Sequence, residues 1–192
     1  MTDHEATDVE AALDLRVDPV AEADAYRSML LGLLGDRDPA QVQAELADQV
    51  QDLVKEAGPH LRTRPAAGEW SVMELLAHNL DAEIVLAGRY RWILAQDEPP
   101  LVGYDQDLWV QRLHSPDEDP GEMLELLRAL KRSHLALWAR TSPSERARVG
   151  IHSERGPESF ELSFRLLSGH GLFHLGQMRR TLAQVAGSGS PR

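Results

Sequence analysis

The chain has 192 residues, a length that suits one domain with a substantial buried core. Its formal net charge of −11 argues against nucleic acid or an anionic membrane as the main partner, because both require a basic surface. The absence of cysteine excludes a disulfide, a zinc–thiolate site and a cysteine nucleophile. The acidic N-terminus has no apolar signal segment, and no run of about 18 apolar residues follows, so we expect a cytoplasmic protein.

Composition and helix-start signals together predict an all-α fold. Ala, Leu, Glu, Gln and Arg dominate and β-branched residues are scarce, which favours helix. An Asp followed by Pro supplies a capping side chain and then a first helical residue. Three such pairs should each open a helix: Asp18-Pro19, Asp38-Pro39 and Asp119-Pro120. The first two predict segments over 19–34 and 39–57, which form either one interrupted helix or two short ones.

Later helices follow from capping and periodicity. Ser71 and Glu74 have the spacing of a capping box and predict a helix to about residue 95. The stretch 97–119 is rich in Pro and Asp and reads as a structured crossover with one short helix around Leu108 to Leu113. An amphipathic helix is expected from Pro120 to Arg140, and a last one from about Ser159 to Val185, after turn signals over 141–158.

Four principal helices joined by long crossovers fit a four-helix bundle with an interrupted first helix. We expect one bundle domain over 19–186, preceded by an acidic tail over 1–18 and followed by a disordered tail over 187–192.

Three histidines are the candidate metal ligands. His170 and His174 lie four residues apart on the last predicted helix, so both imidazoles project from one face and can bind one ion. His78 lies on the apolar face of another helix and could complete a three-imidazole site with an open position. The alternatives are a structural ion, which needs a fourth protein ligand, or buried hydrogen-bonded histidines.

Three further polar residues could assist such a site. Asp81, three residues after His78, could be a base, a fourth ligand or an acceptor for a ligand's ring nitrogen, unless it is simply solvated. Gln177 follows His174 by three residues and could orient a ligand or substrate, or lie at the bundle edge. His134 falls on an apolar stripe and either lines the interior near the metal or is a core histidine.

Small and aromatic residues leave two more alternatives open. Glycine in a helix costs about 0.5–1 kcal/mol relative to alanine, so Gly169, Gly171 and Gly176 suggest a spatial need. Either a neighbouring helix packs closely there, or the missing side chains leave a cleft over the metal. Tyr104 and Trp109 on the crossover either wall the entrance to the site or anchor the crossover to the core.

The two histidine motifs together resemble those of the DinB/YfiT-like superfamily of metalloenzymes, over roughly residues 20–186. The first is a Trp-Ser helix start with a His seven residues on, and the second is an H-x-x-x-H helix trailed by Gln: Trp70, Ser71 and His78, then His170, His174 and Gln177. The resemblance implies a four-helix bundle holding a metal by one His of the second helix and two of the fourth, and homodimers are common in the family. The family includes S-transferases and isomerases that use low-molecular-weight thiols.

The expected function is therefore that of a metal-dependent enzyme. Three neutral imidazoles leave a divalent ion its full charge, so zinc, nickel or iron bound there could activate water or a small-molecule thiol. A hydrolase or a thiol-dependent S-transferase acting on a small molecule would result. The alternative is a non-catalytic metal-binding protein with a structural or interaction role in stress.

Overall fold

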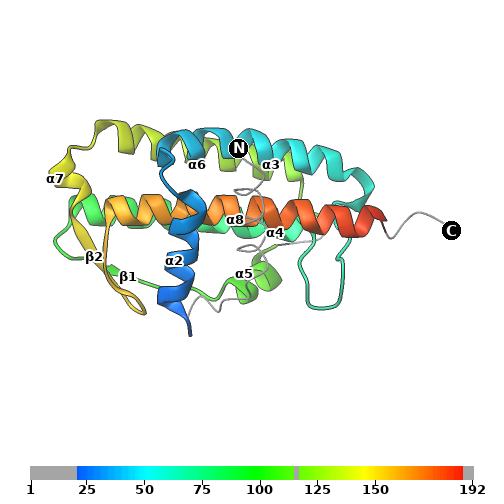
Figure 1. Ribbon diagram of the computed structural model, residues 1–192, viewed down its shortest axis with the longest axis horizontal. Helices are drawn as coiled ribbons and strands as arrows, with labels where there is room; N and C mark the ends of the chain where they lie inside the picture. The colour runs from blue at the N-terminus through cyan, green and yellow to red at the C-terminus, as the bar shows by residue number, and fades with distance from the viewer. Residues whose placement is uncertain (1–20, 115–116, 188–192) are drawn as a thin grey trace.

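A computed structural model describes residues 21–114 and 117–187 and shows a four-helix bundle, as predicted (Figure 1). Helices α3 and α4 each pack against both α6 and α8. Every pair of neighbours in the bundle therefore buries an apolar face. The bundle helices are α3 (Pro39–Ala57), α4 (Val72–Ala95), α6 (Pro120–Arg140) and α8 (Phe160–Gly187).

The predicted interruption of the first helix is a complete change of direction. Helix α2 (Ala23–Leu34) ends at Gly35, whose φ of 58° favours glycine, and α3 then begins at Pro39. In Figure 1, α2 lies across α8 while α3 runs along the bundle, and α2 contacts α8 extensively. The segments over 19–34 and 39–57 are thus two helices, and α2 is an addition to the bundle.

Some expectations about the ends fall outside the described residues. These are the acidic tail over 1–18 and the tail after residue 187. The predicted helix start at Asp18-Pro19 is wrong, because the helix that ends at Leu34 begins at Ala23, with Glu22 as its N-cap. Gly187 itself is the last residue of α8, so the helix runs one residue into the tail that was predicted to begin there.

The other predicted helix caps are present. Asp38 accepts a hydrogen bond from the backbone N–H of Ala40 at 2.8 Å, and Asp119 accepts one from Gly121 at 2.7 Å. Ser71 and Glu74 form both bonds of the capping box that opens α4. These local bonds explain why the starts of α3, α4 and α6 agree with the sequence.

A small three-stranded sheet, which the sequence analysis did not predict, covers the end of the bundle opposite the C-terminus in Figure 1. Strand β2 pairs in parallel with β1 and antiparallel with β3. The strands are β1 (Pro100–Leu101), β2 (Val149–His152) and β3 (Gly156–Ser159). Strand β1 joins the crossover to the sheet, and helix α5 (Gln106–Leu113) of the crossover packs against α4. The remaining short elements are the 3-10 turn η1 (Gly58–His60) and helix α7 (Pro143–Arg146).

The buried core consists of two hydrophobic clusters. The larger joins all four bundle helices through residues such as Leu46, Leu76, Leu127 and Met178. The smaller lies beside the sheet and is rich in aromatic rings, with Trp138 stacked on Phe164 at 4.3 Å between ring centroids. Together they leave the bundle rigid enough to position side chains that project from different helices.

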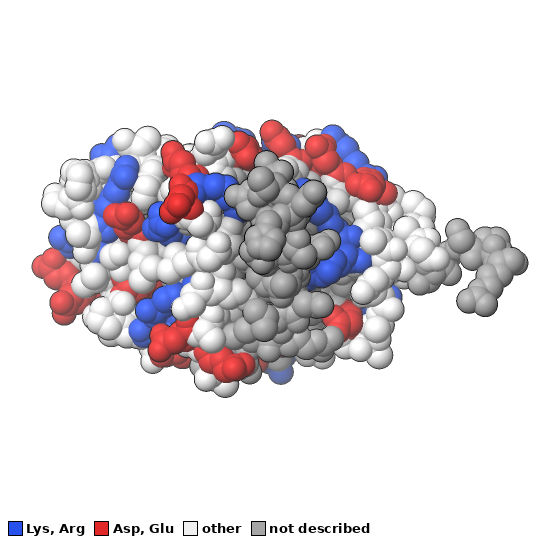
Figure 2. All heavy atoms as spheres, in the orientation of Figure 1, with Lys and Arg blue, Asp and Glu red and all other residues white. Residues whose placement is uncertain are grey.

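Helix hydropathy and surface charge describe the exterior of the molecule. None of the described helices is long and apolar enough to cross a bilayer. Figure 2 shows acidic and basic side chains interspersed over the face that carries α2 and α8.

Candidate metal centre

The three candidate ligands converge at one point between α4 and α8. The Nε2 atom of His78 lies 3.0 Å from that of His170 and 3.1 Å from that of His174. His78 is 1% exposed and His174 is 4% exposed, while His170 is partly exposed. The predicted three-histidine cluster is therefore present, although residues 78 and 170 are 92 positions apart.

The spacing between Nε2 of His78 and the Nε2 atoms of the other two histidines fits a bound divalent ion. Imidazole nitrogens bind zinc at about 2.0–2.1 Å, so two ligands of one ion lie about 2.9–3.4 Å apart for angles between right-angled and tetrahedral. The distances of 3.0 and 3.1 Å fall within this range. Nitrogen donors also suit zinc, nickel and ferrous iron alike.

Protonation of the cluster is compatible with metal binding. The Nδ1 of His174 lies 2.9 Å from Oε1 of Gln177, and because that oxygen can only accept, His174 carries its proton on Nδ1. Its Nε2 lone pair then faces the other two rings. Burial lowers the pKa of His174 to about 4 and holds the pKa values of His78 and His170 well below the usual range.

The cluster opens on a large cavity. Among the described residues, only the three histidines form a group whose ligand atoms all lie within 4.8 Å of one another, so no carboxylate closes the set. His78 and His170 line a cavity of about 520 Å³. Three protein ligands with an open side are typical of catalytic rather than structural zinc sites.

Asp81 lies in a different polar cluster. Its carboxylate is 3.0 Å from Nε2 of His114, whose Nδ1 is 3.0 Å from Glu118. Burial raises the pKa of Asp81 despite the histidine, and the two carboxylates raise the pKa of His114 even though burial opposes them. Sequence reasoning missed His114, because no spacing signal links the end of α5 to α4.

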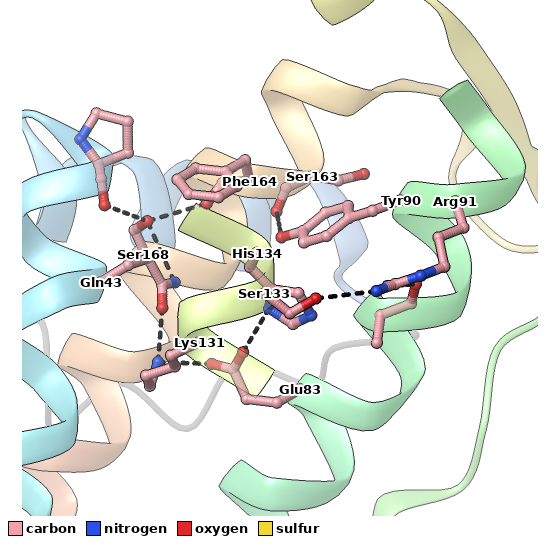
Figure 3. Close-up of polar contacts among 12 residues, drawn as sticks. Gln43, Glu83, Tyr90, Arg91, Lys131, Ser133, His134, Ser163, Phe164 and Ser168 are labelled. Atoms are coloured by element: carbon pink, nitrogen blue, oxygen red, sulfur yellow. Dashed lines mark hydrogen bonds and ion pairs between the residues drawn. The ribbon is translucent and has the colours of Figure 1, made fainter. Parts of the chain in front are cut away.

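His134 lies inside a buried charged network rather than in the histidine cluster (Figure 3). Glu83 is 2.8 Å from Nδ1 of His134 and 2.6 Å from Nζ of Lys131. Lys131 also donates to Gln43, which donates to Ser168 of α8. The network therefore ties together all four bundle helices.

Gly169 and Gly171 of α8 serve close packing, so the cleft hypothesis is wrong for these two residues. A Cβ atom on Gly169 would lie 2.1 Å from the backbone oxygen of Leu30 in α2. One on Gly171 would lie 2.5 Å from a methyl group of Leu46 in α3. Both neighbours occupy the space that a cleft would need.

The cavity lining combines Tyr104, which the sequence analysis selected, with residues that it did not select. Tyr104 lines it and packs on Trp109 at 4.5 Å between ring centroids, so the crossover does wall the cavity. Arg27, Arg89 and His152 line it as well. A signal for Arg89 existed, because it lies eleven residues after His78, three helical turns along the same face.

Comparisons with known proteins identify the class to which this helical bundle belongs. The chain belongs to the DinB superfamily, whose family model matches residues 27–178. A relative from Oceanobacillus iheyensis, named "Putative metal-dependent hydrolase OB0782", is 26% identical over 130 residues, which are 68% of this chain and 73% of the relative.

A solved structure supports the same fold. YfiT from Bacillus subtilis, described as "a probable metal-dependent hydrolase with an unusual four-helix bundle topology", matches with a TM-score of 0.71 at 20% identity. The match covers 90% of this chain and 92% of that chain. The predicted family and the predicted bundle are both confirmed.

Proposed function

We propose that the chain is a metal-dependent hydrolase of small molecules, with His78, His170 and His174 as the metal ligands. The observation that carries this proposal is the convergence of three neutral imidazoles, two of which, His78 and His170, line a cavity of about 520 Å³. A site of this size suits a small-molecule substrate. The printed name of the relative from Oceanobacillus iheyensis favours hydrolysis over other metal-dependent reactions.

Each residue of the site has a distinct part in this proposal. A divalent ion bound there would act as a Lewis acid and lower the pKa of water at its open position. The ring of His78 packs against the ring of Trp70, at 5.0 Å between ring centroids, and this contact helps to fix its position. Gln177 fixes the tautomer and rotation of His174 and is a positioning residue.

The activity can be tested with metal-depleted protein reloaded with zinc, nickel or ferrous iron. We expect hydrolysis of small ester or amide substrates only after reloading, with His170→Ala inactive and His134→Gln serving as the control outside the site. Activity that needs an added low-molecular-weight thiol would instead support the S-transferase alternative, since the chain has no cysteine. Equal activity of the depleted and reloaded protein would contradict the proposal.

The expected homodimer stays a prediction. Sedimentation equilibrium of the full chain would show it as a doubled mass.

A further inference from the structure

The cavity runs from the histidine cluster along two facing helices. On α4 it is lined by His78, Ala82, Leu86 and then Arg89, and on α8 by His170 and then Leu166. Tyr90 of α4 bonds to Ser163 of α8, so both helices lead away from the cluster in the same direction. At about 1.5 Å per residue, the Cα atoms of His78 and Arg89 lie about 16 Å apart along α4. Between the two ends, the residues that α4 and α8 contribute to the wall, Ala82, Leu86 and Leu166, are apolar.

The far end of the cavity holds buried donors without acceptors. Within residues 21–114 and 117–187, Nε of Arg89 and Nε of Arg27 are buried and have no hydrogen-bond partner. Each guanidinium is anchored through one Nη2 atom, Arg89 to the carbonyl of Val102 at 2.6 Å and Arg27 to that of Arg155 at 3.3 Å. Arg89 is only 5% exposed. Burying a charged donor without an acceptor costs free energy, so a ligand that supplies acceptors would stabilise these groups.

His152 of β2 adds a third unpartnered donor to the same wall. Its Nδ1 accepts a hydrogen bond from the backbone N–H of Glu154 at 3.1 Å, so the proton of the neutral ring is on Nε2. That Nε2 is buried and has no partner among the described residues, and the side chain is 2% exposed. Burial and the nearby Arg155 and Arg89 lower the pKa of His152 to about 4, which keeps it a neutral donor.

The acidic residues that line the cavity accept no hydrogen bond from these three donor atoms. The carboxylate of Glu158 is already bound by Arg155, at 2.9 and 3.0 Å, and by Ser163 at 2.6 Å. Asp105 caps α5 through Leu108. Asp107 and Glu154 are exposed at the rim. No described residue therefore supplies an acceptor for Nε of Arg27, Nε of Arg89 or Nε2 of His152.

We propose that Arg27, Arg89 and His152 form a subsite for an oxyanion group, a carboxylate or a phosphate, on a substrate whose middle part is apolar. This inference rests on the proposed function, because it assumes that the other end of the same substrate, which carries the reacting group, lies at the histidine cluster. Arginine suits the task because its planar fork binds carboxylate and phosphate oxygens and stays charged. The subsite thus selects acidic substrates over neutral analogues.

Binding to the full-length protein tests the proposal without measuring activity. The probes are hexanoate, hexan-1-ol as its uncharged analogue, and inorganic phosphate, each followed by calorimetry and by the melting temperature. We expect hexanoate to bind at least tenfold more tightly than hexan-1-ol, because charge-assisted hydrogen bonds are lost with the alcohol. Binding of phosphate alone would identify a phosphate ester as the ligand class. Equal affinity for acid and alcohol, with no phosphate binding, would overturn the proposal.

Matched variants locate the subsite. Arg89→Met and Arg27→Gln should each weaken hexanoate binding at least tenfold, whereas Arg91→Gln on the same helix should not, because Arg91 bonds to Ala87 and Ser133 instead. Arg27 is only partly buried, so its variant keeps the test valid if Arg89→Met does not fold. Unchanged binding in Arg27→Gln would contradict the assignment.

One more variant separates this inference from the proposed function. The triple variant His78→Ala, His170→Ala, His174→Ala should bind no metal yet keep the arginine-dependent hexanoate affinity. If wild-type protein binds hexanoate but no metal, the proposed function is wrong and the subsite still stands. If the protein binds metal but its hexanoate affinity does not depend on the arginines, the subsite is wrong and the proposed function still stands.

Discussion

Replacement of Gly169 by alanine tests how tightly α2 and α8 pack beside the histidine cluster. The new Cβ would lie 2.1 Å from the backbone oxygen of Leu30 and 2.7 Å from its carbonyl carbon, where ordinary contact begins at 3.4 Å. The two helices must therefore separate by about 1.3 Å, because backbone atoms cannot rotate away as a side chain can.

Two opposing effects set the magnitude for Gly169→Ala. Overpacking typically costs about 1–3 kcal/mol, and the upper end applies to a backbone clash, whereas alanine in a helix gains about 1 kcal/mol over glycine. We expect a net loss of about 2 kcal/mol in the free energy of unfolding, equivalent to about 4–8 °C in melting temperature for a chain of this size.

Thermal and urea unfolding followed by circular dichroism measure this loss. Gly32→Ala on α2 is the matched control, because no atom outside its local helix lies within 4 Å of the new Cβ and only the helix gain of up to about 1 kcal/mol remains. The packing account is refuted if Gly169→Ala is as stable as Gly32→Ala.

Three further predictions concern the metal, the buried network and pH. Gln177→Leu should weaken zinc affinity by about 10- to 100-fold in calorimetry, because His174 loses its acceptor; unchanged affinity would show that Gln177 does not position the ring. Glu83→Leu should lower the free energy of unfolding by about 3–5 kcal/mol, because it leaves the buried Lys131 charge unpaired. Adding Lys131→Met should recover part of that loss in urea titrations. If the losses of the two single variants simply add in the double variant, the two residues are not coupled. Burial acts to raise the pKa of Glu158, but Arg155 and Ser163 outweigh it and lower that pKa below 4.5, so its contribution is present above pH 4.5 and lost as pH falls below it. Acid titration of unfolding should therefore show a shallower slope for Glu158→Gln than for wild type, and an equal slope would refute this assignment.

Helix starts were predictable because their signals are local. Asp38, Ser71 and Asp119 each bond to a backbone N–H within three residues of themselves, so a few letters of sequence contain the whole interaction. The sheet lacks such a signal. Its strands are two to four residues long, and β1 pairs with a segment about fifty residues away.

The candidate site likewise has residues with a local sequence signal and residues without one. The sequence identified His170 and His174 by their helical spacing, and His78 by its place on an apolar helix face. The partners of Asp81 and His134 could not be inferred, because His114 and Glu83 reach them from other elements. The arginine subsite depends on the crossing of α2 over α8, which only the folded chain reveals.

Metal stoichiometry tests the central claim most directly. Purified full-length protein, equilibrated with zinc and then dialysed, should retain about one ion per chain by elemental analysis, since the three histidines form one site. The triple variant His78→Ala, His170→Ala, His174→Ala should retain almost none while keeping its helical circular dichroism spectrum. Equal metal content in the two proteins would contradict the three-histidine centre.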